Sequence, residues 1–291
     1  MSEMGARYDQ RARLYEQFWA PVLAPSAIRL LDAIEPTVAA VPTSHLLDAG
    51  TGSGTLAMAA ARRWPQVRVT GLDISAGMLA VAREAAAARL AQPERERLAL
   101  VEGSVVDPNA AGLAPASIDA VISSFALHLV PDRAAALAGL RGVLRPGGAL
   151  AFVVWAQDRP WAPEAAFDAA LAEVLARSGS AAPPPVGGPR SGPVASAAAA
   201  RAELQEAGFV EIDAWEPTLQ HRFGRAAARA FFVEYDRAEE LAALSRARQA
   251  QVLAAFDAAL AQLPDGAFAW HARLIAARRC GRRAADPGPG G

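Results

Sequence analysis

The chain has 291 residues, of which 53% are hydrophobic and 20% are charged, and its formal net charge is −1 at pH 7. This length suits one large domain with insertions, and the near-neutral charge argues against nucleic acid as the main partner. Every basic side chain is arginine, so chemistries that need a lysine, such as phosphate-loop and pyridoxal chemistry, are excluded.

The sequence carries no pattern typical of a secreted or membrane protein. The uncharged runs around 120–131 and 146–157 are shorter than the roughly 18–20 residues that a membrane-spanning helix requires. The segment MSEMGARYDQ is charged where a signal peptide would be apolar, and Cys280 is the only cysteine. We therefore expect a cytoplasmic protein without disulfides or a membrane span.

The first expected elements are helical. Residues 7–34 carry apolar side chains at helical spacing, which predicts two short helices broken near Pro21 and Pro25. We expect residues 1–43 to form an N-terminal helical cap. Its aromatic residues are core candidates that could also cover a bound ligand.

From residue 44 to residue 155, apolar strands alternate with helices. The expected order is a strand at 46–47, a helix ending near 64, a strand at 67–72, a helix at 76–90, strands at 98–101 and 118–123, a helix at 133–144 and a strand at 149–155. This alternation predicts an α/β fold with a doubly wound, mostly parallel sheet.

Beyond residue 155 the alternation is weaker. Residues 156–193 are expected to form an insertion, with a helix at 161–177 followed by a Pro/Gly/Ser-rich mobile loop at 178–193. Residues 194–283 are expected to complete the sheet, with a helix at 195–207, strands at 210–215 and 268–275, and a helical insertion at 222–264. The tail at 284–291 is expected to be disordered.

The stretch LLDAGTGSGTL, at 46–56, places glycines at every second position after the first expected strand. Glycine lacks a Cβ and tolerates positive φ, so such a turn brings backbone close to a ligand, although a plain tight turn is the competing interpretation. Asp73 ends the next strand about 20 residues later, where a carboxylate can accept hydrogen bonds from both ribose hydroxyls. Together these features predict a nucleotide-like site.

The acid inside the glycine stretch separates two possible ligands. NAD would bring a pyrophosphate to this turn, and Asp48 would repel it. S-Adenosylmethionine (SAM) would bring an ammonium and a sulfonium, which a nearby anion stabilises. The charge therefore favours SAM.

Five successive motifs then identify a resemblance. They are LLDAGTGSGTLA, GLDISAGMLAVAREAA, VEGSVVD, SIDAVISSFALHLVPD and LRPGGALAFVVW. In order and spacing they are similar to the class I SAM-dependent methyltransferases, in the small-molecule subgroup that includes ubiquinone and menaquinone biosynthesis. The resemblance covers 44–155 as the SAM-binding core. It implies a Rossmann-like sheet of seven strands in the order 3-2-1-4-5-7-6, with strand 7 antiparallel.

The same resemblance implies the residues that bind SAM and its product S-adenosylhomocysteine. They are Asp48, Gly50, Thr51, Gly52, Asp73, Ile74, Met78, Ser104, Val105, Ser123 and Phe125. Asp48 would hold the aminoacyl end and Asp73 the ribose. The family often has an aspartate that accepts from the adenine amine where this chain has Ser104, so Ser104, the Val105 amide or Asp107 could serve instead. No metal is expected.

Methyl transfer depends mainly on aligning the acceptor and excluding water, so a base is needed only if the acceptor is a hydroxyl. His128 is the first candidate because its ordinary pKa is near neutral, although it could simply pack beside the cofactor; Tyr15 and His221 are further candidates. We expect a small, partly apolar acceptor, and the sequence leaves a homodimer open.

Two other functions compete with methyl transfer. One is a non-catalytic scaffold on the same fold, and the other is an NAD-dependent oxidoreductase. DNA amino methylation is disfavoured because the chain reads SSFA where that reaction would call for an (N/D)PP(Y/F) motif.

Overall fold

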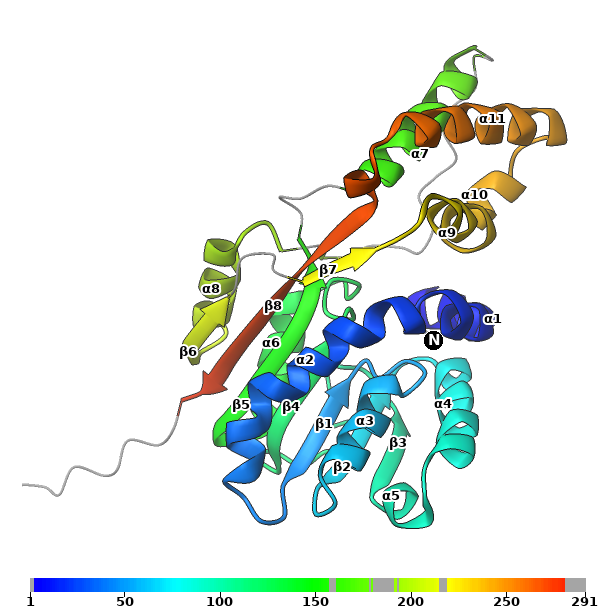
Figure 1. Ribbon diagram of the computed structural model, residues 1–291. Helices are drawn as coiled ribbons and strands as arrows, with labels where there is room; N and C mark the ends of the chain where they lie inside the picture. The colour runs from blue at the N-terminus through cyan, green and yellow to red at the C-terminus, as the bar shows by residue number, and fades with distance from the viewer. Residues whose placement is uncertain are drawn as a thin grey trace, which may run out of the picture.

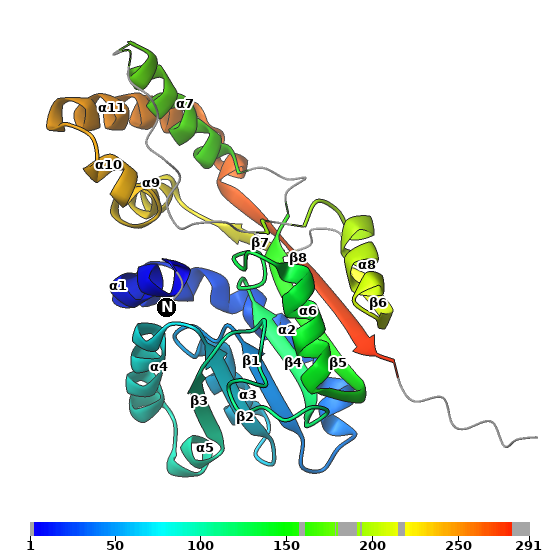
Figure 2. The ribbon, with the colours of Figure 1, turned by 180° about the vertical axis from the view of Figure 1, so that it is seen from behind.

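The computed structural model describes residues 3–156, 161–177, 179, 191–192, 194–214 and 219–280. In this part of the chain a central sheet carries helices on both faces, and further helices stand beyond one end of the sheet (Figure 1). The view from behind shows the second helical face (Figure 2). The predicted mobile loop at 178–193, apart from residues 179, 191 and 192, and the predicted disordered tail at 284–291 lie outside the described residues.

The sheet has eight strands in the order β3-β2-β1-β4-β5-β8-β6, with β7 paired to β8. They are β1 (His45–Ala49), β2 (Arg68–Asp73), β3 (Leu98–Glu102), β4 (Ile118–Ser124), β5 (Leu144–Trp155), β6 (Phe209–Ala214), β7 (Leu219–Arg222) and β8 (Ala269–Arg279). Strand β8 runs antiparallel to β5 and β6 and takes the place of the predicted seventh strand. The predicted fold class and order are confirmed, and β7 is an additional strand that was not predicted.

Helices pack on both faces of the sheet and form an apolar layer on each. Successive side chains of a strand point to opposite faces, so each strand contributes to both layers. The covering helices are α2 (Ala20–Ala39), α3 (Thr55–Arg63), α4 (Ala76–Arg89), α6 (Arg133–Val143) and α8 (Ala197–Glu206), with the short α5 (Gln92–Glu96) before β3. Leu46 packs into the layer of α2 and α3, and Leu47 packs into the layer of α6 and α8. Both faces of the parallel strands are thus buried, as doubly wound sheets require.

The predicted break between the first two helices is wrong in position. Helix α1 (Glu3–Phe18) and α2 meet at Trp19, and α2 continues through Pro25. Pro21 lies in the first turn of α2, where its missing N–H costs little. Leu30 and Ile34 are fully buried against the sheet, and this packing stabilises α2 in spite of the interior proline.

A helical subregion stands beyond the end of β5. It contains α7 (Ala162–Arg177), α9 (Arg225–Ala230), a π-helix (Phe231–Asp236), α10 (Ala238–Ala242), α11 (Arg246–Gln262) and a 3-10 turn (Asp265–Phe268). Three near-parallel indoles join it to the sheet: Trp155 lies 3.8 Å from Trp270, and Trp270 lies 4.5 Å from Trp161, between ring centroids. The aromatic rings therefore fix this subregion above the strand ends.

Candidate functional site

The carboxyl ends of β1, β2 and β4 bring several predicted site residues to one edge of the sheet. Asp48 lies in β1, Asp73 ends β2, and Ser123 lies near the end of β4. Open α/β sheets bind ligands at this edge. The Ser123 hydroxyl donates to the Ala49 carbonyl at 2.7 Å, so it joins β4 to the start of the glycine turn.

The glycine turn needs glycine for two physical reasons. Gly50 and Gly52 have φ of +75° and +56°, in the region that disfavours other residues. A Cβ on Gly50 would lie 2.3 Å from the Cβ of Ala126, and one on Gly52 would lie 3.1 Å from the Cε of Met78. The turn is therefore pressed between the loop after β4 and the first turn of α4.

Asp73 is held by backbone groups on both of its oxygens. Oδ2 accepts from the Gly52 N–H at 2.8 Å, and Oδ1 accepts from the Ser75 N–H at 3.0 Å. Burial raises the pKa of Asp73, and these hydrogen bonds oppose the rise. Ser75 caps α4 by accepting from the Met78 N–H at 3.0 Å. Asp73 thus joins the glycine turn to the start of α4.

Asp48 is the most unusual group of the site. It is 1% exposed, and its Oδ2 accepts from the Thr51 hydroxyl at 2.7 Å. Its Oδ1 has no hydrogen-bond partner among the described residues. Burial raises the pKa of Asp48 to about 7, although hydrogen bonds from Thr51 and the Ala57 backbone lower it. A buried acceptor without a partner is costly, and it indicates a site that awaits a donor.

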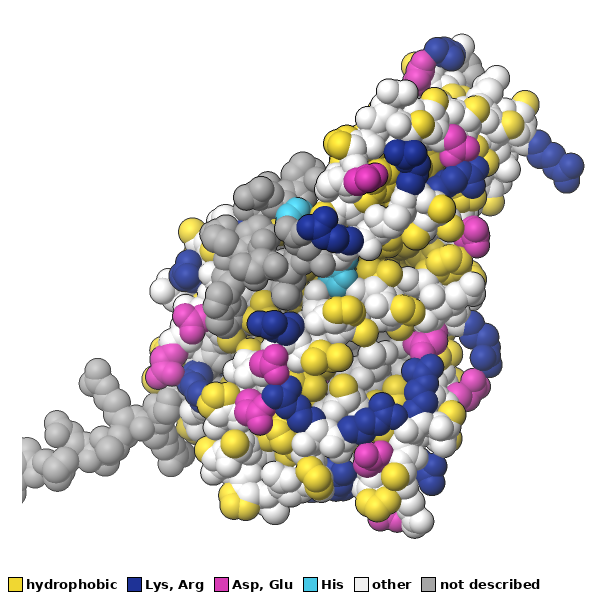
Figure 3. Space-filling view, viewed as in Figure 1, with side chains coloured by type: hydrophobic (Ala, Val, Ile, Leu, Met, Phe, Trp, Pro, Cys, Tyr) yellow, Lys and Arg dark blue, Asp and Glu magenta, His cyan; other side chains and the backbone are white. Residues whose placement is uncertain are grey.

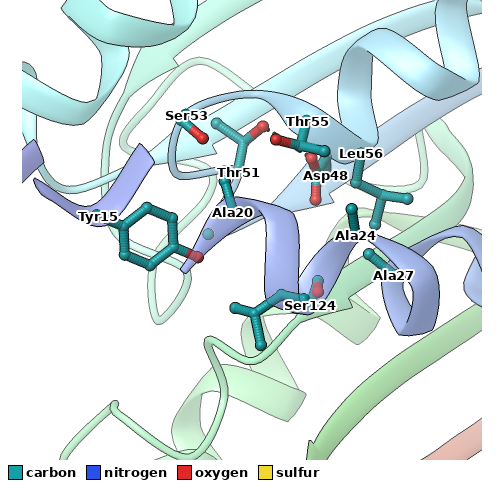
Figure 4. A pocket seen from close by; sticks show the side chains of 12 residues that line it. Tyr15, Ala20, Ala24, Ala27, Asp48, Thr51, Ser53, Thr55, Leu56 and Ser124 are labelled. Carbon is teal, nitrogen blue, oxygen red and sulfur yellow. Dashed lines mark hydrogen bonds between the residues drawn. The ribbon is translucent and has the colours of Figure 1, made fainter. Parts of the chain in front are cut away.

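A cavity of about 30 Å³ lies beside Asp48 (Figure 4). Its wall opposite the glycine turn is formed by Tyr15 and the apolar face of α2. Burial raises the pKa of Tyr15 well above its ordinary value, so the phenol stays protonated. Tyr15 and the apolar face of α2 narrow the approach to Asp48. The structure therefore describes a conformation in which the cap lies close on the site.

The loop after β4 places one aromatic ring at the site and one histidine further out. Phe125 has a φ of +52°, a strained value for a large residue, and its ring lies 4.3 Å from that of Trp155. His128 is partly exposed, and its carbonyl accepts from the Gly192 N–H. His128 is not among the described residues that line the cavity.

The loops after β2 and β3 form the opposite side of the site. Ile74 and Val106 are large apolar side chains that are 37% and 36% exposed, while Val105 is buried. The Ser104 hydroxyl oxygen accepts from the Val106 N–H at 3.2 Å. Asp107 accepts from the Ala110 N–H, so its carboxylate caps its own loop. Two apolar side chains at this edge of the sheet are therefore open to contact by an apolar group.

His221 gains importance from the structure. It lies on β7, is 5% exposed, and its Nε2 is 2.5 Å from the hydroxyl oxygen of Ser26 on α2. Its ring lies 5.8 Å from Phe125 and 5.6 Å from Trp155. Burial lowers the pKa of His221, and a hydrogen bond with the Val22 backbone opposes this, so the ring is neutral at pH 7.

The sequence analysis missed Asp9 on α1. Its Oδ1 accepts from the Ser75 hydroxyl at 2.6 Å and from the Gly77 N–H at 2.8 Å. Asp9 therefore connects the cap to the first turn of α4, next to Asp73. The available signal was weak, because Asp9 is one of many charged residues on a polar helix.

Two features are absent from the residues that the structure describes. No group of three His, Cys, Asp or Glu side chains in this part of the chain could hold a metal ion. None of the helices that the structure describes is both long and apolar enough to cross a membrane. On the face shown in Figure 3, arginine and acidic side chains are interspersed rather than separated by sign.

Comparison with known proteins gives a consistent result. Residues 46–148 match the family model of a methyltransferase domain. The chain is 30% identical over 227 residues to the nocamycin O-methyltransferase of Saccharothrix syringae, a match that covers 76% of this chain and 77% of that protein. It is 32% identical over 146 residues to the aklanonic acid methyltransferase DauC of Streptomyces sp. (strain C5), which covers 50% of this chain and 61% of that protein.

A solved structure shows the same fold. It is phosphoethanolamine N-methyltransferase 2 of Haemonchus contortus in complex with S-adenosylhomocysteine, with a TM-score of 0.54 and 17% identity over 94% of this chain and 57% of that one. At this identity the likeness concerns the fold alone. The chain also spans less than two thirds of the length of DauC, so its own activity and substrate need separate arguments.

The raised pKa of Asp48 predicts how stability depends on pH. The unfolded carboxyl ionises near pH 3.8 and the folded one near pH 7, so its contribution to stability is present below pH 3.8 and is lost as pH rises through 7. Asp48→Asn cannot ionise, and its amide oxygen can still accept from Thr51. We expect the variant to be more stable than the wild type at pH 8 by up to roughly 4 kcal/mol, and much less so at pH 4.

Urea unfolding at pH 4, 6 and 8 measures this difference. Asp107→Asn, which removes an exposed carboxylate, is the matched control and should change stability little at each pH. Equal stability of the wild type and Asp48→Asn at pH 8 would contradict the prediction. It would show that other interactions offset the cost of ionising the buried carboxylate.

Proposed function

The chain belongs to the class I methyltransferases, which use SAM, and we propose that it transfers the SAM methyl group to a small, partly apolar acceptor. The observation that carries this proposal is the buried Asp48, whose Oδ1 has no partner among the described residues. A cationic ligand at the glycine turn would supply the missing donor and favour the ionised carboxylate. SAM has such a cationic end.

The residues present fit the parts of SAM. The ammonium of its aminoacyl end suits Asp48, and the glycine turn from 50 to 52 allows close approach of backbone. Both oxygens of Asp73 are oriented by backbone N–H groups and keep free lone pairs for ribose hydroxyls. Ile74 is exposed beside Asp73, where it would contact the adenine. These assignments are proposals, as are those of Thr51, Met78, Ser104, Val105, Ser123 and Phe125.

SAM supplies an electrophilic methyl group, and the chain supplies alignment and exclusion of water. The cap and the apolar face of α2 close on the strand ends, so the charges of the reacting groups would be shielded from solvent. Phe125 and Trp155 provide flat apolar walls next to this region. These features support a partly apolar acceptor.

We infer that the acceptor atom is oxygen, which agrees with the name of the relative nocamycin O-methyltransferase. A hydroxyl acceptor must lose its proton as the methyl group arrives. We propose that His221 takes it, because His221 is neutral, buried and close to Phe125, although neither His221 nor His128 is among the described residues that line the cavity. Tyr15 stays protonated, and His128 is partly exposed.

The alternatives have weaker support. An NAD-dependent oxidoreductase would bring a pyrophosphate to Asp48, whose charge opposes it. A scaffold that binds no SAM would not need a costly buried carboxylate at the turn, and a scaffold that binds SAM would show no transfer to any acceptor. We also propose a cytoplasmic location, on the basis of a single, exposed cysteine, and we do not propose a homodimer.

Asp73→Ala tests the cofactor assignment. The variant loses two hydrogen bonds from ribose hydroxyls to a charged acceptor, which are worth about 1.5–3 kcal/mol each, so SAM affinity should fall by about 100-fold or more. Calorimetric titration with SAM, S-adenosylhomocysteine and NADH measures it, with Asp213→Ala, which removes an exposed carboxylate on β6, as the control and melting curves to verify folding. Binding of NADH in place of the two sulfur ligands would contradict the proposal.

His221→Asn tests the base. With a hydroxyl acceptor found by screening phenols and alcohols against methyl-tritiated SAM, the wild-type rate should fall as pH drops through the lowered pKa of His221, below its ordinary 6.5. The variant should be at least about tenfold slower at pH 7.5, and its rate should not show this fall at low pH. Its affinity for SAM should be unchanged. A variant with the wild-type pH profile would exclude His221 as the base.

A further inference from the structure

Helix α1 is attached to the molecule differently from α2, which follows it. Among the described side chains of α1, only those of Arg11 and Ala12 are classed as buried, whereas α2 buries a whole apolar face in the core of the sheet. Trp19 separates the two helices and packs 4.6 Å from Phe231 and 5.7 Å from Trp155. Aromatic packing therefore holds Trp19 in place at the junction. Helix α1, which precedes it, has few fully buried side chains.

Asp9 provides the most specific contact between α1 and the rest of the protein. Its Oδ1 accepts hydrogen bonds from the Ser75 hydroxyl at 2.6 Å and the Gly77 N–H at 2.8 Å. The Ser75 N–H in turn donates to Asp73 at 3.0 Å. A continuous chain of hydrogen bonds therefore runs from α1 to the acid that we assign to the ribose.

The backbone of α1 also fits closely on α4. A Cβ on Gly77 would lie 2.8 Å from both the Cα and the carbonyl oxygen of Asp9. Any side chain at position 77 would push α1 away, because contacts this short with backbone do not occur. Glycine is also a poor helix former, so its place in the first turn of α4 is explained by this close approach.

The position of α1 controls the size of the cavity. Tyr15 lies six residues after Asp9 on α1 and forms part of the cavity wall beside Asp48. Because Tyr15 covers the approach to Asp48, α1 must move for SAM to enter or leave, and it can return to the same contacts once SAM is bound. Two ion pairs also join α1 to α4, Arg13–Glu84 at 3.2 Å, which is exposed, and Glu16–Arg89 at 3.0 Å. Elsewhere on α1, Tyr15 and Phe18 pack against the apolar clusters of the sheet and the helical subregion.

We propose that Asp9 is a positioning residue that latches α1, and with it Tyr15, over the SAM site and so sets how fast SAM and its product exchange. This inference rests on the proposed function. The latch lies between α1 and α4 and outside the residues assigned to the aminoacyl end. Breaking the latch should therefore raise the rate constants for both association and dissociation of the cofactor, while the dissociation constant changes little.

Two variants break the latch by different routes. Asp9→Ala removes the acceptor, and Gly77→Ala displaces the backbone of α1 while it favours the helical conformation of α4. The matched control is Arg13→Ala, which removes an exposed ion pair between the same two helices. Stopped-flow measurements with S-adenosylhomocysteine give the rate constants, and hydrogen exchange of the amides at 3–18 reports opening of α1.

In both latch variants, we expect the association and dissociation rate constants to rise by about tenfold each, with less than about a threefold change in the dissociation constant. Amide exchange at 3–18 should accelerate by a similar factor. Arg13→Ala should resemble the wild type in both measurements. A variant that merely damages the fold would bind more slowly and melt at a lower temperature, and this result would count against the latch.

The failures of the two proposals are distinguishable. If the wild type binds neither SAM nor S-adenosylhomocysteine, the proposed function fails and the latch has no cofactor to control. If the wild type binds both ligands and the latch variants show wild-type rate constants and wild-type amide exchange, the proposed function stands and the latch is excluded.

Discussion

The structure of the site depends on one electrostatic constraint, a carboxylate that β1 carries into the protein interior. Asp48 is almost completely buried, and Thr51 supplies a hydrogen bond to only one of its oxygens. Without a cation, burial raises its pKa to about 7, which means that the protein keeps a group that is costly to ionise. A cationic ligand removes that cost. The glycine turn allows close approach of a ligand, and Tyr15 and the apolar face of α2 cover this region.

The same constraint explains why the site has a cover. A buried charge interacts strongly with a ligand only where water is excluded, and a site that excludes water must open to exchange its ligand. The two parts of the N-terminal segment divide these tasks. Helix α2 is part of the sheet's apolar layer and forms a fixed wall, whereas α1 combines polar contacts on α4 with the partly buried rings of Tyr15 and Phe18. The short junction at Trp19 makes this division possible.

The sequence predicted the features that local pattern determines. Apolar periodicity predicted the strands and most helices of the core, and the spacing between the glycines and Asp73 predicted two groups that the structure brings together, since the Gly52 N–H donates to Asp73. It missed features that depend on contacts between distant segments. Asp9 meets Gly77 across 68 positions, and Ser26 meets His221 across 195. β7 is four residues long and shows no clear alternation, and the burial of α2 outweighs the proline signal that suggested a break.

The most direct test of the central claim counts the protons that SAM binding releases. Calorimetric titration at pH 6, in two buffers with different ionisation enthalpies, gives this number. In the free protein Asp48 is mostly protonated at pH 6, and the cationic ligand favours its ionised form, so the wild type should release close to one proton per SAM bound. Asp48→Asn should release none. Equal proton release by the two proteins would contradict the assignment of Asp48 as the partner of the cationic end of SAM.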